Sequence, residues 1–380
     1  MQPEPLLSAD QNKEQRWVGG ICIRRHRIRC LLAPIINGGE LHLARAVTGK
    51  FQVSSDLYTD LHRAVGLLIR WGERAGPLAG IGVSCYGPFE SLWLGDRPPL
   101  GEHEDGETGY GRLTDRGLGA FGGVNLHQEV CRSWVDNDYS PIPVSVHVDA
   151  NASALGEYVW LSRFRQFDRS RAFGGTDARD RIVSLMIDDG IGVGVAENFG
   201  VPASRQHAEM GHWRLPVTLT TTIESDPLFK RPLPEQKCIH LEEVVGCYYH
   251  GRECFEGVLS LKAIEERSEK TISELVEDRL HPDWILIVSY IEELANMATL
   301  AFAPNMVVID SPLARNPELA ENANTLFQSR LAQTGLLSYA ELEREDGFIQ
   351  SRKNPSAGAL GAAQLALKDA IDFNWGDLLQ

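Results

Sequence analysis

Apolar and polar residues follow two different periods along this chain, and each period predicts a type of secondary structure. Residues 57–74 carry apolar side chains at helical spacing, which predicts an amphipathic helix. Residues 285–303 predict a strongly apolar helix, and residues 357–367 predict a helix of small side chains suited to close packing. Short apolar runs bounded by turn residues predict buried strands at 17–23, 28–34, 78–84, 143–148, 182–187 and 306–309. Because strands and helices occur in both halves, we expect α/β domains around mainly parallel sheets.

Length and charge narrow the class of protein. A chain of 380 residues has room for two domains. It carries 52 acidic and 37 basic side chains, for a net charge of −15. A nucleic-acid binder needs a basic face to replace the counterions of the phosphates, so this balance argues against that class. A hydrophobic content of 43% with 23% charged residues is ordinary for a soluble protein with a full core.

The remaining composition points to a cytoplasmic protein. No apolar run approaches the roughly 20 residues that a membrane helix needs. Residues 1–16 are polar without the apolar segment of a secretion signal, so we expect a flexible tail there. Seven cysteines, an odd number spread over a long chain, fit reduced thiols better than a disulfide framework.

The most specific chemistry lies in one short segment that fits a metal ion. Cys247, His250 and Cys254 offer two thiolates and an imidazole at spacings that let a turn wrap tetrahedral zinc. His212 is the best candidate for a fourth ligand, and the competitors are Cys238, His240 and, more weakly, His207. The alternative is a set of unrelated buried cysteines and surface histidines. Three candidate ligands in eight residues favour zinc, and four protein ligands would make it structural.

Several segments of this chain resemble, in the same order, the ROK family of sugar kinases, particularly its bacterial fructokinase-like branch. The resemblance spans roughly residues 17 to 367, where chance agreement of so many ordered motifs is improbable. Its landmarks are Tyr86-Gly87-Pro88, Tyr110-Gly111-Arg112-Leu113-Thr114, the segment from Asp149 to Glu157, Glu209-Met210-Gly211-His212, the segment from Cys247 to Gly257, and Ala357-Gly358-Ala359-Leu360-Gly361-Ala362.

The resemblance implies an actin-like ATPase (ribonuclease H-like) fold, in which two α/β domains surround a cleft for sugar and nucleotide, usually in a homodimer. It implies an N-terminal domain at 17–150, a C-terminal domain with the zinc loop at 151–353, and a closing helix at 354–380 that returns to the first domain. Asp149 would be the base that deprotonates the acceptor hydroxyl. Without the resemblance, a helix N-cap would be the simpler interpretation of Asp149. The expected sugar-binding residues are Asn151, Glu209, His212 and Glu256.

The nucleotide motifs depart from the family pattern at three places. Phosphoryl transfer needs phosphates cradled by backbone N–H groups in glycine turns, with magnesium to neutralise charge. The first turn instead holds Arg24, Arg25 and Arg27, the second begins with Asp188 and Asp189, and the third reads Asp310-Ser311-Pro312. Carboxylates would repel a triphosphate by about 1–4 kcal/mol per pair of charges, depending on the dielectric. We therefore do not expect ordinary use of MgATP. The alternative is a rearranged nucleotide site in which the arginines hold phosphate and the aspartates bind a metal.

Three functions compete. The first is a sugar enzyme without ATP, with Asp149 as the proton-transfer residue and Arg24, Arg25 and Arg27 holding an anionic group of the substrate. The second is an active but divergent hexose kinase. The third is a non-catalytic sugar sensor that acts through a protein partner, because the segment before Trp17 is too short for a DNA-binding domain.

Overall fold

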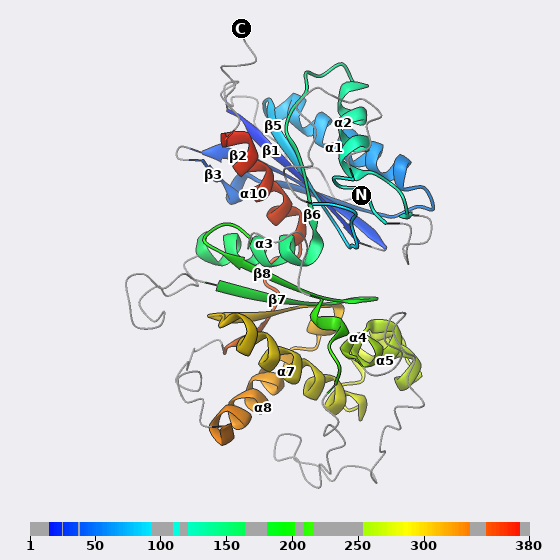
Figure 1. The fold of residues 1–380 in the computed structure, drawn as a ribbon, viewed down its shortest axis with the longest axis vertical. Helices are drawn as coiled ribbons and strands as arrows, with labels where there is room; N and C mark the ends of the chain where they lie inside the picture. The colour runs from blue at the N-terminus through cyan, green and yellow to red at the C-terminus, as the bar shows by residue number, and fades with distance from the viewer. Residues whose placement is uncertain are drawn as a thin grey trace. The chain divides into compact units, whose positions relative to one another are not determined.

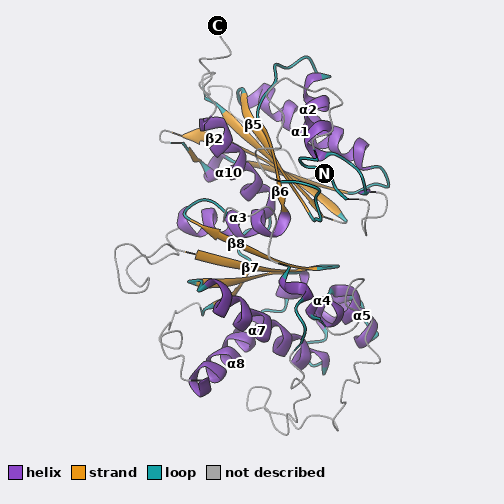
Figure 2. Cartoon of the chain, viewed as in Figure 1, coloured by secondary structure: helices purple, strands orange, loops and turns teal. Residues whose placement is uncertain are grey.

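The chain divides into two compact units. Unit 1 comprises Met1–Ser170, Ala196–His207 and Asn354–Gln380, and unit 2 comprises Arg171–Val195 and Ala208–Lys353. The computed structural model describes residues 15–24, 26–36, 39–92, 109–114, 121–163, 181–201, 209–215, 254–334 and 347–372. Figure 1 shows the order of the elements, and Figure 2 shows that each unit combines helices with a sheet.

Unit 1 is built on a mixed sheet of six strands in the order β3-β2-β1-β5-β6, with β4 paired to β2. Strands β1 and β2 form an antiparallel hairpin, whereas β1, β5 and β6 run parallel. The hairpin makes this sheet mixed rather than mainly parallel as expected. The elements are β1 (Trp17–Arg24), β2 (Arg27–Ile36), β3 (Glu40–Leu41), a 3₁₀ turn at Leu43–Arg45, β4 (Val47–Gln52), α1 (Leu57–Ala75), β5 (Leu78–Cys85), α2 (Leu126–Val135), β6 (Val144–Val148), α3 (Asp149–Arg163) and α10 (Ala357–Asp372).

Helices cover both faces of the unit 1 sheet, because successive residues of a strand point to opposite sides. A Cβ atom added at Gly19 of β1 would lie 2.7 Å from Leu68 of α1. A Cβ added at the next residue, Gly20, would lie 1.9 Å from the carbonyl oxygen of Ala359 in α10. Glycine in β1 therefore allows α10 to approach the strand backbone closely, as the small residues of this helix predict.

Helix α3 packs against α10 and belongs to unit 1, although we expected the boundary between the domains at residue 150. A Cβ at Gly156 of α3 would lie 1.8 Å from the carbonyl oxygen of Ala357. A Cβ at Gly361 of α10 would lie 1.7 Å from the carbonyl oxygen of Ala152. Such close backbone contact groups α3 with the sheet of unit 1.

Unit 2 has a second sheet, of four strands, in the order β10-β9-β7-β8. Strands β7, β9 and β10 run parallel. The elements are β7 (Arg181–Ile187), β8 (Ile191–Glu197, whose last two residues are grouped with unit 1), η5 (Met210–His212), α4 (Phe255–Leu259), α5 (Leu261–Ser268), α6 (Ile272–Glu277), α7 (Asp283–Phe302), β9 (Met306–Asp310), η8 (Pro312–Arg315), α8 (Glu318–Thr334) and β10 (Ile349–Ser351).

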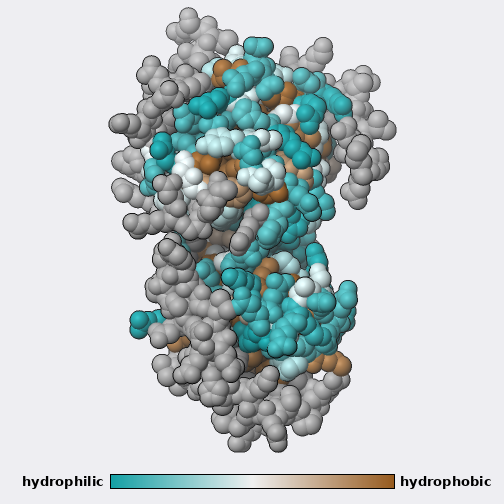
Figure 3. Space-filling view, turned by 90° about the vertical axis from the view of Figure 1, so that its right-hand side faces the viewer, coloured by the Kyte–Doolittle hydropathy of each residue, from teal (hydrophilic) through white to brown (hydrophobic). Residues whose placement is uncertain are grey.

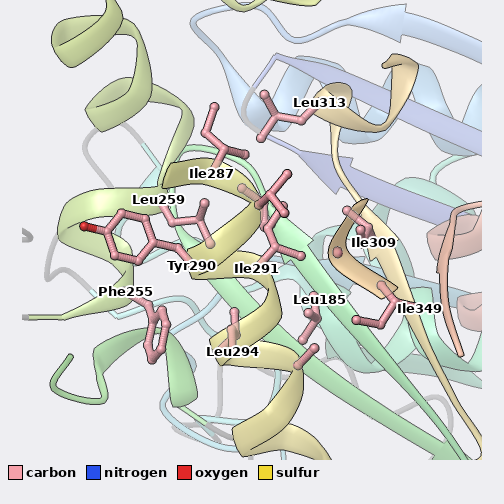
Figure 4. Packing of buried hydrophobic residues seen from close by; sticks show 14 of the residues in the cluster. Leu185, Phe255, Leu259, Ile287, Tyr290, Ile291, Leu294, Ile309, Leu313 and Ile349 are labelled. Atoms are coloured by element: carbon pink, nitrogen blue, oxygen red, sulfur yellow. The ribbon is translucent and has the colours of Figure 1, made fainter. Parts of the chain in front are cut away.

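The core of unit 2 forms around α7. Ile287, Ile291 and Leu294 of this helix are fully buried, and they belong to one apolar cluster with Phe255 and Leu259 of α4 (Figure 4). The same cluster includes Leu185, Ile309 and Ile349 of the sheet. Burial of such side chains is the main favourable contribution to the stability of this unit.

Helix α7 is long and apolar enough by length and composition to cross a membrane, although the sequence showed no uninterrupted apolar run of that length. However, 61% of its most apolar window is buried inside the protein, as in the core helix of a soluble protein. Leu300 near its end is 62% exposed. The described residues on the face drawn in Figure 3 are mostly hydrophilic, with smaller hydrophobic areas between them.

Candidate functional site

Asp149 lies at the carboxyl edge of the unit 1 sheet. In the strand register, Ile23 of β1 is opposite Cys85 of β5, and Cys85 is opposite Val148 of β6. Asp149 follows Val148 directly, begins α3 and is only 2% exposed. It lies within the helix rather than at the N-cap position. Burial raises the pKa of the Cys85 thiol well above its usual range, and the nearby Asp149 carboxylate raises it further. The described chain thus holds a buried carboxylate beside a protonated thiol.

Arg24 shares this edge with Asp149. It is the last residue of β1, it pairs in register with Arg27 of β2, and it is only 9% exposed. The chain leaves β1 toward β2 and leaves β5 toward β6, in opposite directions across the sheet. Ligands of open α/β sheets bind outside the carboxyl ends of strands at such a switch point. The structure therefore brings Arg24 and Arg27 to a suitable edge, whereas Arg25 lies outside the described residues.

Asn151 and Glu157, both in the motif that begins at Asp149, have different settings on α3. Asn151 is half-buried in the first turn. Glu157 is fully buried, and its Oε1 accepts a hydrogen bond of 2.8 Å from the backbone N–H of Asn354. The Asn354 side chain in turn accepts from the N–H of Ser356, just before α10. Glu157 therefore fastens the start of α10 to the helix that carries Asp149.

In unit 2, Glu256 lies against the turn between β7 and β8. Its Oε2 accepts a hydrogen bond of 3.2 Å from the backbone N–H of Ile191. A Cβ at Gly190 would lie 3.0 Å from the same oxygen. Glu256 occupies the first turn of α4. The absence of a side chain at residue 190 is what leaves room for this carboxylate.

Glu209 and His212 come to the same strand start through the short helix η5. A Cβ at Gly211 would lie 2.5 Å from the carbonyl oxygen of Ile191, so η5 rests directly on β8. His212 Nε2 lies 3.8 Å from Glu209 Oε2. Glu256 therefore contacts Ile191, and the η5 segment that carries Glu209 and His212 rests on the same residue.

Two of the four predicted zinc ligands lie on neighbouring segments. An antiparallel bridge pairs Arg214 with Cys254, and the N–H of Phe255 donates to the carbonyl of Trp213 at 3.4 Å. Arg214, which pairs with the fully buried Cys254, follows His212 closely in the sequence. The backbone segments of His212 and Cys254 are therefore neighbours. Cys247, His250 and the competitors Cys238, His240 and His207 lie outside the described residues. Within the described ranges no group of three metal-binding side chains occurs.

Side chains occupy the carboxyl edge of the unit 2 sheet. Asp188 and Asp189 form the turn after β7, where the N–H of Asp189 donates to Asp188 Oδ1 at 3.1 Å. Asp310, at the end of β9, is fully buried and forms an ion pair with Arg352, which follows β10. Ser311 caps η8 by accepting a hydrogen bond from the N–H of Leu313. No sequence motif indicates the role of Arg352, because 42 residues separate it from Asp310.

Comparisons with known proteins identify the family to which this chain is similar. The family model described as "ROK family" matches residues 137–369, more than half of the chain. A fructokinase of Pediococcus pentosaceus is 26% identical over 275 residues, which are 67% of this chain and 81% of that protein. A putative fructokinase of Bacillus subtilis (strain 168) is 25% identical over 280 residues, 73% of this chain and 79% of that protein.

The solved structures confirm the fold. The crystal structure of ROK hexokinase from Thermus thermophilus aligns with a TM-score of 0.57 at 18% identity, covering 94% of this chain and 100% of that one. Both units therefore belong to the expected actin-like ATPase fold.

Proposed function

This chain belongs to the ROK family, and we propose that it binds a hexose or hexose derivative, with Asp149 as the proton-transfer base, without ordinary use of MgATP. Its homology is to fructokinase-like sugar kinases. The observation that carries the proposal is an asymmetry. Asp149 and Glu256, which are predicted for proton transfer and sugar binding, are held by burial and by a backbone hydrogen bond, while charged side chains stand at the edges where the resemblance predicts glycine turns for a nucleotide.

The base function rests on the setting of Asp149. A carboxylate at the end of a strand can accept the proton of a sugar hydroxyl that is brought within hydrogen-bond distance. Burial to 2% exposure keeps bulk water from competing for that position. The predicted sugar-binding residues are Asn151 of the same helix and, in unit 2, Glu209, His212 and Glu256. Their amide, carboxylate and imidazole groups suit the many hydroxyls of a polyol.

The exclusion of MgATP rests on charge. Asp188, Asp189 and Asp310 stand at the carboxyl edge of the unit 2 sheet, and the cation paired with Asp310 is Arg352. A triphosphate approaching this edge would meet the partly exposed carboxylates of Asp188 and Asp189 rather than backbone N–H groups. In unit 1, Arg24 and Arg27 would instead hold an anionic group already on the substrate, such as a phosphate or carboxylate, through guanidinium forks.

Structural zinc would support the predicted sugar-binding residues of unit 2. The bridge between Arg214 and Cys254 fits a shared ion held by His212, Cys247, His250 and Cys254. Two thiolates and two imidazoles are a suitable donor set for tetrahedral zinc. A bound zinc would fix the η5 segment to the start of α4. Zinc would thereby position His212 and Glu256.

The specific alternative is an active, divergent ATP-dependent hexose kinase, which the named relatives favour. A non-catalytic sugar sensor is the second alternative.

We further propose a cytoplasmic homodimer. That proposal rests on the family resemblance and on the cysteine usage, in which the described cysteines are all buried and form no disulfide.

Calorimetric titration separates these functions. A non-hydrolysable MgATP analogue is titrated into zinc-replete protein, with and without saturating fructose. We expect no heat from the nucleotide and a measurable heat from a hexose or a phosphorylated hexose. Micromolar nucleotide binding that tightens with fructose would contradict the proposal and favour the kinase. Sugar binding without turnover of any tested sugar would instead support the sensor.

Comparison of neutral and phosphorylated hexoses tests the anion site. Arg24→Gln should weaken binding of the phosphorylated hexose while leaving the neutral one unchanged. Arg132→Gln, on α2, is the matched control and should change neither affinity.

A further inference from the structure

Helices α7 and α8 of unit 2 meet through a cluster of charges that the proposed function does not use. Glu292 and Glu293 are consecutive residues of α7, and both contact Arg330 of α8. Arg330 Nη2 lies 3.2 Å from Glu292 Oε2, while Arg330 Nη1 binds Glu293 Oε2. One guanidinium group thus serves two carboxylates.

Burial of an ionised carboxylate costs more free energy at Glu292 than at Glu293. Its side chain is fully buried, and neither of its carboxylate oxygens accepts a hydrogen bond from any described residue. The Glu293 side chain keeps 11% exposure. An ionised carboxylate needs full pairing and hydrogen bonds to offset the loss of water. Burial therefore raises the pKa of Glu292 to about 7, and Arg330 offsets part of this rise.

The other elements packed on α7 supply no second cation to Glu292 among the described residues. Arg267 of α5 is paired with Asp283 at the start of α7, at 2.9 Å. Arg181 of β7 donates to the carbonyl of Phe302 at the end of α7. The other charged side chains of α4 and α5 are engaged in other contacts: Glu256 with Ile191, Lys262 with Glu266, and Glu265 with Ile272. The acidic residues of α8, Glu318 and Glu321, lie in its first turn, and Glu318 is paired with Arg279. Because Arg330 is shared with Glu293 and offsets only part of the cost, protonation relieves the rest of the buried charge of Glu292.

The same helix supports the element that carries Glu256. Ile291, next to Glu292, and Leu294 belong to the apolar cluster that includes Phe255 and Leu259 of α4 (Figure 4). Interiors of proteins are close-packed, so a shift of α7 relative to α8 is transmitted to its other neighbours.

We propose that Glu292 is a pH-sensitive switch in unit 2: its protonated carboxyl holds α7 and α8 together, and its ionisation loosens the pair. The direction follows from linkage. When the pair opens, Glu292 enters water and returns to its ordinary pKa near 4.5. The folded state thus binds the extra proton between pH 4.5 and about 7. The stabilising contribution is complete below this window, is lost as the pH rises through it, and is constant above it.

Urea unfolding over pH 4.5 to 8.5 tests the switch. Relative to Glu292→Gln, which mimics the protonated form, the wild-type folding equilibrium constant should fall by up to about tenfold per pH unit and then level near neutrality. Glu293→Gln is the matched control. It should retain a decline that ends at lower pH, because Arg330 then serves Glu292 alone.

Hydrogen exchange of the wild-type protein locates the effect without any variant. After correction for intrinsic exchange rates, opening of α7 and α8 should increase over the same window, while β1 and α10 of unit 1 should not follow it. A wild-type chain with the pH dependence of Glu292→Gln, or an equal response in both units, would overturn the proposal.

Discussion

At the scale of single residues, the neighbours of Asp149 determine the chemical setting of its carboxylate. The carboxylate is held at the junction of β6 and α3, next to the last residue of a parallel strand, and the thiol of Cys85 beside it stays protonated because of its raised pKa. A group that is buried yet located at a sheet edge is well suited to take a proton from a bound substrate.

Asp149→Asn should therefore abolish proton transfer while preserving the fold. We expect sugar-dependent turnover to fall by roughly 10²–10⁴-fold, the usual contribution of a general base. Steady-state assays with the sugar identified by calorimetry measure the loss, and circular dichroism reports the fold. Asp136→Asn, at an exposed carboxylate after α2, is the control and should keep full activity. Unchanged turnover in Asp149→Asn would remove this residue from the mechanism.

Gly190 positions Glu256 through the absence of a side chain. In Gly190→Ala the new Cβ would stand 3.0 Å from Glu256 Oε2, so the carboxylate must move away from the Ile191 N–H. The proposal places this carboxylate on the sugar, where a hydrogen bond to a charged group contributes about 1.5–3 kcal/mol, so its displacement should lower sugar affinity by up to roughly tenfold. Calorimetry measures the affinity.

The control for this variant is Gly66→Ala in α1, where the nearest atom to a new Cβ is Arg70 Nη1 at 3.6 Å. That substitution should raise stability by about 0.5–1 kcal/mol and leave sugar binding alone. Equal affinities in the two variants would show that Glu256 does not contact the sugar.

At the scale of elements, the motifs that resemble the family differ in what they do: some hold the fold together, and others carry candidate functional residues. Tyr110, in a segment that resembles the family, accepts a hydrogen bond of 3.2 Å from the N–H of Val146 on the edge strand β6. The next residue, Gly111, has a φ of +72° and would place a Cβ 3.0 Å from Val146. This motif closes a sheet edge, whereas the motif beginning at Asp149 supplies the candidate base.

Zinc content tests the pairing of η5 with α4. Cys254→Ser should lower bound zinc well below one equivalent and lower the melting temperature, because a thiolate ligand is lost at a tetrahedral site. Cys131→Ser is the matched control, since Cys131 is also buried but belongs to α2 of unit 1. Mass spectrometry of the metal-loaded protein measures the zinc. A full equivalent retained by Cys254→Ser would exclude this thiol as a ligand.

At the scale of the whole molecule, each unit is stabilised by its own core, so we expect a core substitution to destabilise the unit that contains it. Ile287 is fully buried in unit 2, and Ile21 is fully buried in unit 1. Ile287→Ala should cost about 2–5 kcal/mol of stability and accelerate hydrogen exchange in α7 and α8, but not in α10. Ile21→Ala should produce the reverse pattern in hydrogen-exchange mass spectrometry. Loss of protection spread evenly over both units in either variant would contradict separate cores.

Local sequence determined several helices of this protein and the motifs that identify its family. The helical periodicity of 57–74 is confirmed by α1, and the small residues of 357–367 are confirmed by the backbone packing of α10 on β1 and β5. The prediction of the ROK family and its fold is likewise confirmed, since ordered motifs such as the one from Asp149 to Glu157 carry a specific signal. These features depend on residue type and spacing over short distances, which a sequence displays directly.

Only the tertiary structure decided features that join distant segments. The close contact of α3 and α10, the pairing of Asp310 with Arg352, and the shared guanidinium of Glu292 and Glu293 each depend on which elements become neighbours. Strand pairing and helix packing select those neighbours through long-range burial, for which a local pattern carries no signal. The zinc ligands, the sugar contacts and Asp149 as a base stay predictions for the experiments above.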